Sequence, residues 1–148
     1  MFRFIPRFAA VLLLVVAGTL VPAAAKERPF KASGGGNVNS FYLEVTGKAS
    51  HLGRSSLVVF FDENFLGSGG SFSSTSQGYI FSASGDVLIF NFDVGYYSID
   101  PAGVVSVPLT FVGGTGRFQD ASGSAVATFV FDFDVYQFVF VMVGSIDY

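Results

Sequence analysis

The sequence predicts an all-β protein, a single antiparallel up-and-down β-barrel of about eight strands preceded by a signal peptide. The chain holds 18 Gly and 19 Phe with many Val and Ser, a composition typical of pleated sheet and tight turns. Several segments alternate apolar and polar residues at period two, as half-buried strands do. Parallel strands need crossover connections of about a dozen residues, and no helical period of that length is present. The strands must therefore pair antiparallel in sequence order, and closure into a barrel removes the two exposed edges of the sheet.

Residues 1–25 have the parts of a secretory signal peptide. Arg3 and Arg7 give a positively charged start, residues 9–21 are an apolar run, and three alanines form a cleavage site before Lys26. The alternative is a retained membrane anchor, but the run is shorter than the ~20 residues that a spanning helix needs. We therefore expect a secreted protein, periplasmic or extracellular, that meets the membrane only during export. The chain has no Cys, so it forms no disulfide.

The rest of the chain, residues 26–148, has the size of one barrel domain. The whole chain has a formal net charge of −3, and two of its 8 cationic residues lie in the signal peptide, so the exported domain is more acidic still. Nucleic acids and anionic lipid surfaces both require clustered positive charge. The charge balance therefore excludes nucleic acid as a partner.

The first part of the domain contains two clear strands. The Gly run at 34–36 predicts a flexible lead over residues 26–39, with at most a short strand at its start. Residues 41–51 alternate cleanly between apolar and polar side chains and predict a half-buried strand. A turn at Gly53 leads into a second strand, residues 56–61, which is apolar on both faces.

A loop and a hairpin follow. Residues 65–76 are rich in Gly and Ser and predict a loop passing into a weak strand, which becomes firm from 78 to 83. Residues 84–86, Ser-Gly-Asp, are typical of a hairpin turn. The next strand is predicted over 87–97, with one row of side chains on a single face: Leu88, Phe90, Phe92 and Val94.

The last part of the domain predicts three strands. Residues 100–103, Asp-Pro-Ala-Gly, form a turn with Pro at its second position. Strands are predicted over 104–112 and 122–132, and a bend near Asp134 leads into a final strand over 136–146.

A Gly-rich turn joins the second and third strands from the end. Glycines reach positive backbone dihedrals at no steric cost, and we expect Gly114 and Gly116 to adopt them. We expect the apolar ring of Phe118 to plug the adjacent end of the core, with Arg117 facing water. A phosphate-binding loop would need a helix directly after it, with Lys and Ser/Thr at fixed offsets, and neither is present. The sequence therefore predicts a structural turn motif: Gly113, Gly114, Thr115, Gly116 and Phe118.

This GGTGRF stretch, followed by Ala121 and Gly123, resembles a sequence shared by allene oxide cyclases and dirigent proteins. Residues 47–54 resemble a second motif of small secreted bacterial relatives, and residues 144–148 resemble the closing strand of the same group. The resemblance implies the antiparallel barrel fold and, as is common in those families, a homo-oligomer. It implies no catalytic residue, because the acidic, Arg, Asn and Tyr motifs inside those barrels match no position of this sequence.

Few side chains could carry out chemistry. His51, the one histidine, ends a strand; a Ser/His/Asp relay would need it in the barrel mouth, whereas the alternative is a surface or rim position. Asp132 and Asp134 have a spacing that ordinary solvated residues share, so we predict no metal site and no cofactor. Six residues are candidates for lining a ligand cavity, with the charged ones at its polar end if they face inward: Glu44, His51, Phe90, Phe92, Asp93 and Arg117.

Two segments, 57–61 and 126–143, carry apolar side chains on both faces. An eight-stranded barrel fills its interior with one face only, so something must cover the other. Self-association is the simplest answer, because the outer faces of two such strands approach the ~800 Å² per partner of an ordinary interface.

These features favour a secreted, non-catalytic barrel that binds a small apolar ligand or serves as a structural or self-associating module. The first alternative is a cyclase-like or dirigent-like enzyme that guides a reactive intermediate, since such chemistry needs mainly a shaped apolar cavity. A further alternative is a small outer-membrane barrel, because residues 140–148 alternate at period two and end in an aromatic residue.

Overall fold

A computed structural model describes residues 26–38, 42–60, 71–73, 77–93 and 95–148. The signal peptide predicted for residues 1–25 and most of the loop predicted at 65–76 lie outside these ranges. Within the described part of the chain, no helix is long and apolar enough to cross a membrane.

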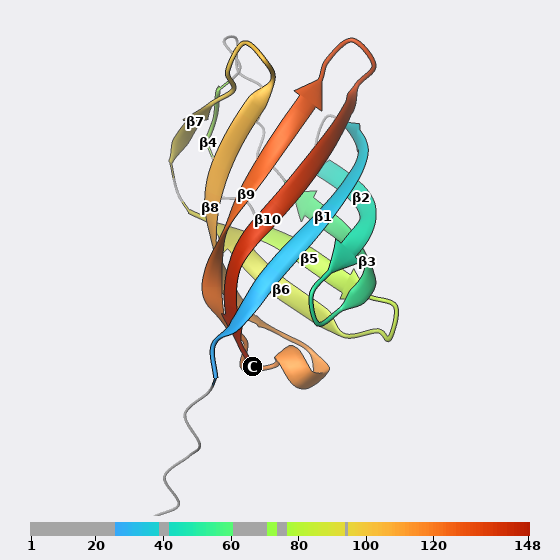
Figure 1. The fold of residues 1–148 in the computed structure, drawn as a ribbon, viewed down its shortest axis with the longest axis vertical. Helices are drawn as coiled ribbons and strands as arrows, with labels where there is room; N and C mark the ends of the chain where they lie inside the picture. The colour runs from blue at the N-terminus through green and yellow to red at the C-terminus, as the bar shows by residue number, and fades with distance from the viewer. Residues whose placement is uncertain (1–25, 39–41, 61–70, 74–76, 94) are drawn as a thin grey trace, which may run out of the picture.

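The described residues form a closed antiparallel β-barrel of eight strands (Figure 1), which confirms the predicted fold class. Each barrel strand pairs with the barrel strands before and after it in the sequence, and the first pairs with the last, in the order β1-β10-β9-β8-β6-β5-β3-β2. The pairing is therefore up-and-down throughout. The barrel strands are β1 (Arg28–Val38), β2 (Tyr42–Ala49), β3 (Gly53–Phe60), β5 (Gln77–Ser82), β6 (Val87–Phe92), β8 (Val104–Gly114), β9 (Ser122–Asp132) and β10 (Gln137–Asp147).

The prediction of a flexible lead over residues 26–39 was wrong. Strand β1 runs for 11 residues and closes the barrel by pairing with both β10 and β2. Its glycines serve close packing: a Cβ atom on Gly34 would lie 2.7 Å from the Thr46 carbonyl oxygen and 3.0 Å from the Phe140 ring. Glycine is required where a backbone and a large ring both approach this closely, so the run belongs inside a strand.

The strand predicted over 87–97 is also shorter in the structure. Strand β6 ends at Phe92, and β7 (Tyr96–Ser98) leaves the barrel to pair with β4 (Ser71–Ser73) in a separate two-stranded sheet. The Tyr97 side chain packs on the residues before β7: its hydroxyl donates a hydrogen bond to the Asp93 carbonyl oxygen at 3.0 Å, and its ring lies against Gly95. Apolar residues continue in the sequence past the end of β6, and for this reason the strand was predicted to extend to residue 97.

The barrel interior is aromatic. The row predicted to share one face of strand β6 is buried as far as it is described: Leu88 and Phe90 are 0% exposed and Phe92 is 3% exposed. Rings contact one another across the interior, with centroids 4.8 Å apart for Phe30 and Phe111. Nine of the phenylalanines whose side chains the structure describes are buried in this core: Phe30, Phe90, Phe92, Phe111, Phe118, Phe129, Phe131, Phe138 and Phe140.

Candidate functional site

The Gly-rich turn lies between β8 and β9 and contains one 3₁₀ turn, η1 (Gly116–Phe118). Gly116 has a positive φ of 57°, as predicted, but the second positive value, 121°, belongs to Gly113. The expectation for Gly114 was wrong: both glycines end β8, and only Gly113 has a positive φ there. Gly114 is needed for close approach instead: a Cβ atom there would lie 3.0 Å from the Cβ of Phe118.

Thr115 fixes this turn to the start of β6. Its backbone N–H donates to the Val87 carbonyl oxygen at 2.8 Å, and its hydroxyl oxygen accepts from the Val87 N–H at 2.9 Å. Both polar groups of the Val87 backbone are thereby satisfied by a single residue. These bonds explain the Thr of the GGTG sequence as a structural residue.

Phe118 closes the same end of the barrel. Its side chain is 0% exposed, and its ring lies 4.8 Å from the ring of Tyr148, the last residue of the chain. Figure 1 shows η1 as a short coil at the base of the barrel, beside the C-terminus. The burial predicted for Phe118 is confirmed.

Arg117 was predicted to face water, and its side chain is exposed, but it also makes contacts that the prediction did not include. Its side chain is 48% exposed, but its Nε lies 3.5 Å from Asp86 Oδ2, and its guanidinium donates to the His51 carbonyl oxygen. The guanidinium carbon also lies 4.9 Å from the centre of the Phe118 ring. Arg117 therefore connects three turns at one end of the barrel: η1, the β5–β6 hairpin and the β2–β3 turn.

His51 lies in the β2–β3 turn with a positive φ of 66°. Its Nε2 lies 2.9 Å from the Pro29 carbonyl oxygen, which can only accept, so Nε2 carries the proton and donates. The ring also packs 5.5 Å from that of Tyr148. These described contacts are a backbone carbonyl and an aromatic ring, which hold a turn in place, whereas a catalytic relay would need a nucleophile and an orienting carboxylate.

The remaining candidates do not join His51 and Arg117. Asp93 follows the far end of β6, a strand of six residues and therefore ~20 Å long, whereas Arg117 lies beside its start. Asp93 Oδ1 accepts a hydrogen bond from the Thr110 hydroxyl at 3.3 Å. Phe90 and Phe92 are core residues. Glu44 lies on β2, where its backbone pairs with that of Val58 on β3, but the structure does not describe its side chain. The six candidates thus do not form one site.

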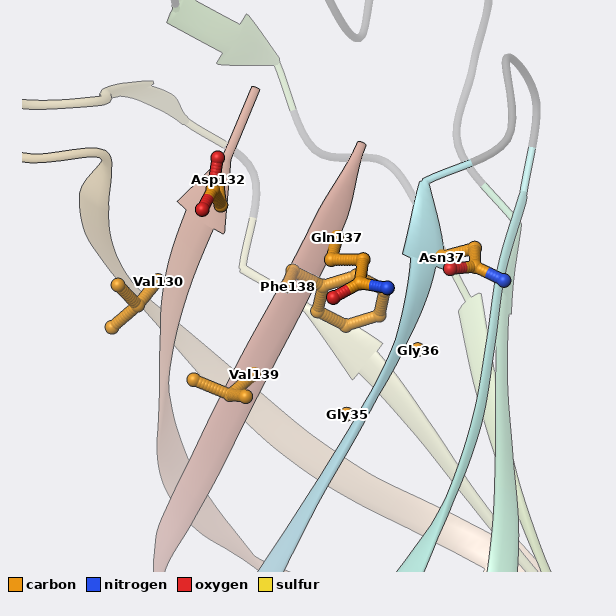
Figure 2. A pocket seen from close by; sticks show the side chains of 8 residues that line it. All are labelled: Gly35, Gly36, Asn37, Val130, Asp132, Gln137, Phe138 and Val139. Atoms are coloured by element: carbon orange, nitrogen blue, oxygen red, sulfur yellow. The ribbon is translucent and has the colours of Figure 1, made fainter. Parts of the chain in front are cut away.

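A groove of about 440 Å³ lies at the ends of β1, β10 and β9, and the sequence analysis missed it. Figure 2 shows Asn37 and Gln137 on adjacent strands, Val139 farther along the strand of Gln137, and Val130 on the far side of that strand from Asn37. Asn37 and Gln137 are paired in the β1–β10 register, which no local sequence pattern could have revealed. The groove combines amide groups and the Asp132 carboxylate with an apolar wall.

The outer surface of β9 and β10 is unusually apolar. Ten large hydrophobic side chains are exposed among the described residues, and eight of them lie on this one hairpin. We call the five that lie on the two strands the valine face: Val126, Val130, Val139, Val141 and Val143. The other three are in the turn that joins the strands: Phe133, Val135 and Tyr136.

The described residues contain no group of three or more His, Cys, Asp or Glu side chains that could hold a metal ion. A comparison of the chain with protein-family models, curated proteins and solved structures finds no match.

Proposed function

We propose that this chain is a secreted, non-catalytic β-barrel related to the allene oxide cyclase and dirigent group, and that it acts as a structural or interaction module through its outer surface. The observation that carries the proposal is the packed interior. Among the described residues, large inward side chains of non-adjacent strands pack on one another, as in the pair Phe30 and Phe111, and such packing argues against a substrate cavity between them.

Two alternatives fit less well. A cyclase-like or dirigent-like enzyme needs an interior cavity around its intermediate, whereas the inward side chains of the described strands pack on one another. An outer-membrane barrel has an apolar outer band on all its strands and a polar lumen. Here the interior is aromatic, and exposed charged residues stand on the outside of three strands, at Lys31, Lys48 and Arg54.

The groove beside Asn37 and Gln137 supports a second candidate function, the binding of a small, partly apolar ligand at the barrel rim. Its wall is formed by Val130 and Val139, and the two amides could orient polar groups of a ligand. This second candidate function also places the binding site on the outside of the barrel.

The substitution Ala127→Trp tests the proposal. Ala127 is 0% exposed and lies on the inner face of β9, so an indole there should overpack the core and lower the melting temperature strongly. Val112→Trp, at a position that is 49% exposed, is the matched control and should leave the melting temperature nearly unchanged. A barrel with an open ligand cavity would instead accept Ala127→Trp at wild-type stability and lose the binding of an apolar fluorescent probe, which would overturn the proposal.

Secretion is tested separately by determining the first residue of the exported protein, which should be Lys26.

A further inference from the structure

The valine face is regular and carries no charge within its boundary. In the β9–β10 register, Val126 pairs with Val143 and Val130 pairs with Val139. Thr128 pairs with Val141 between them, and its hydroxyl is already hydrogen-bonded to that of Ser106 on β8 at 2.9 Å. Covering this face would therefore leave no hydroxyl without a partner.

The concentration of exposed apolar residues on one hairpin indicates an interface. Scattered surface hydrophobics are normal in monomers, but a contiguous and charge-free patch marks an interaction site. A closed barrel has no free strand edge, so a partner must pack face to face on the side chains. Figure 1 shows β9 and β10 side by side along one wall of the barrel, flanked by β8 and β1.

The arrangement of the valines points to one particular partner. We propose that the valine face binds the same face of a second copy of this chain in a closed twofold dimer. A half-turn about the line through Thr128 and Val141 exchanges the Val126–Val143 pair with the Val130–Val139 pair, so valines of one copy lie over valines of the other. An interface of this kind must match itself under such a rotation, and this face does. The inference rests on the proposed action through the outer surface.

The charged residues at the ends of the face agree with the same rotation. Asp132 lies beside Gln137 at one end, and Lys31 lies beside Val143 at the other, ~20 Å away along β10. The half-turn brings Lys31 of the second copy to the end that carries Asp132, displaced from it by about two strand spacings, ~10 Å, to the side and by two residues, ~7 Å, along the strand. Asp147 lies four residues beyond Val143, ~13 Å farther along β10 and outside the face. Each end of the dimer therefore carries one negative and one positive side chain, at a distance where they attract each other at low salt.

The strands that carry the valine face supply the centre of an interface. Strands β9 and β10 each contain 11 residues, which gives a length of ~36 Å, and the pair is ~10 Å wide. The product, on the order of 350 Å², is nearly half of the ~800 Å² that each partner contributes to an ordinary stable interface, and the flanking strands β8 and β1 must supply the rest. The apolar centre and polar margin also match the usual division of an interface.

Sedimentation equilibrium of the chain expressed from Lys26, which contains every described element, tests the proposal. The wild type should be a dimer at micromolar concentration. Val141→Lys should raise the dissociation constant at least ~100-fold, because it buries two unpaired charges at the centre of the interface. Val112→Lys is the matched control, since Val112 is 49% exposed and Val141 is 50% exposed, and it should remain dimeric. Thermal melting of Val141→Lys should show a folded monomer.

A charge exchange tests the orientation. At low salt, where screening is weak, Asp132→Lys and Lys31→Asp should each raise the dissociation constant several-fold, and the double variant should restore it. Any of three results would overturn the proposal. The wild type could stay monomeric, Val141→Lys could stay dimeric, or the double variant could have a higher dissociation constant than either single variant. Flotation of a monomeric wild type with phosphatidylcholine vesicles would overturn it in favour of a lipid surface. None of these outcomes alters the result expected for Ala127→Trp, so the failure of the dimer can be distinguished from the failure of the proposed function.

Discussion

The guanidinium Nε of Arg117 lies 3.5 Å from the carboxylate Oδ2 of Asp86, and this contact joins the turn after β8 to the β5–β6 hairpin. The same side chain bonds to the His51 carbonyl and covers the Phe118 ring. A single arginine thus links its own turn to two others at one end of the barrel. The consequences can be measured.

Arg117→Ala should lower the free energy of unfolding by about 1 kcal/mol. The ion pair is half exposed and contributes little, so most of the loss comes from the hydrogen bond to His51 and the contact with Phe118. Urea denaturation of the variant and the wild type measures this difference. Arg54→Ala, at an exposed position on β3, is the control and should change stability by less than about half as much. Equal stability of wild type and Arg117→Ala would mean that these contacts are not formed in solution.

Gly116→Val should cost about 1 to 3 kcal/mol from its positive φ alone, and more because a Cβ atom there would overlap the Asp86 carboxylate. Gly53→Val separates the two effects. Gly53 has a similar φ of 70°, but a Cβ atom would meet nothing within 4 Å. The melting temperature of Gly116→Val should therefore be the lower of the two. If the two variants have the same melting temperature, the overlap with the Asp86 carboxylate does not affect stability.

Phe118→Ala should be the most damaging change in this turn, at ~3 to 5 kcal/mol, because it removes a fully buried ring that packs on Tyr148. Phe118→Leu should recover a large part of the loss, since it keeps most of the apolar volume. Thermal melts should rank the variants with Arg117→Ala highest, Gly116→Val lower and Phe118→Ala lowest. The opposite ranking, with an intact fold in Phe118→Ala, would contradict the account of this turn as a plug.

Burial, together with the nearby Asp93 carboxylate, raises the pKa of Tyr97 above its ordinary value of 10.0. A phenol whose pKa is higher in the folded than in the unfolded state stabilises the fold below pH 10, and this contribution is lost as the pH rises through the folded value. Stability should therefore fall above about pH 10, and Tyr97→Phe should reduce that fall. The difference between the absorbance titrations of the two proteins at alkaline pH isolates the phenol of Tyr97. A midpoint at or below 10 would contradict the burial.

Much of the fold could be predicted because the interior obeys a local rule. Period-two alternation places Leu88, Phe90 and Phe92 on one face of a strand wherever that strand lies, and the structure buries all three. The turn at Asp100 was equally local: its Oδ1 accepts from the N–H groups of Ala102 and Val104 at 2.9 and 2.8 Å. Such contacts join near neighbours, so the sequence order already contains them.

The errors came from contacts between distant parts of the chain. The glycine at position 34 is typical of a flexible segment when it is considered alone, and it belongs to a strand only because Thr46 and Phe140 lie against it. Arg117 is exposed as predicted, but its contact with the His51 carbonyl, 66 residues away, was missed. The candidate residues failed to form a site for the same reason, since β6 separates Asp93 from Arg117.

The sequence by itself determined that this protein is a barrel of antiparallel strands, because composition, alternation and short turns are properties of neighbouring residues. It also showed that residues 126–143 are apolar on both faces. Only the tertiary structure decided which row points inward. Closure of the barrel placed Ala127 and Phe129 in the core and left Val126 and Val130 outside, because one strand can direct only alternate side chains to the interior.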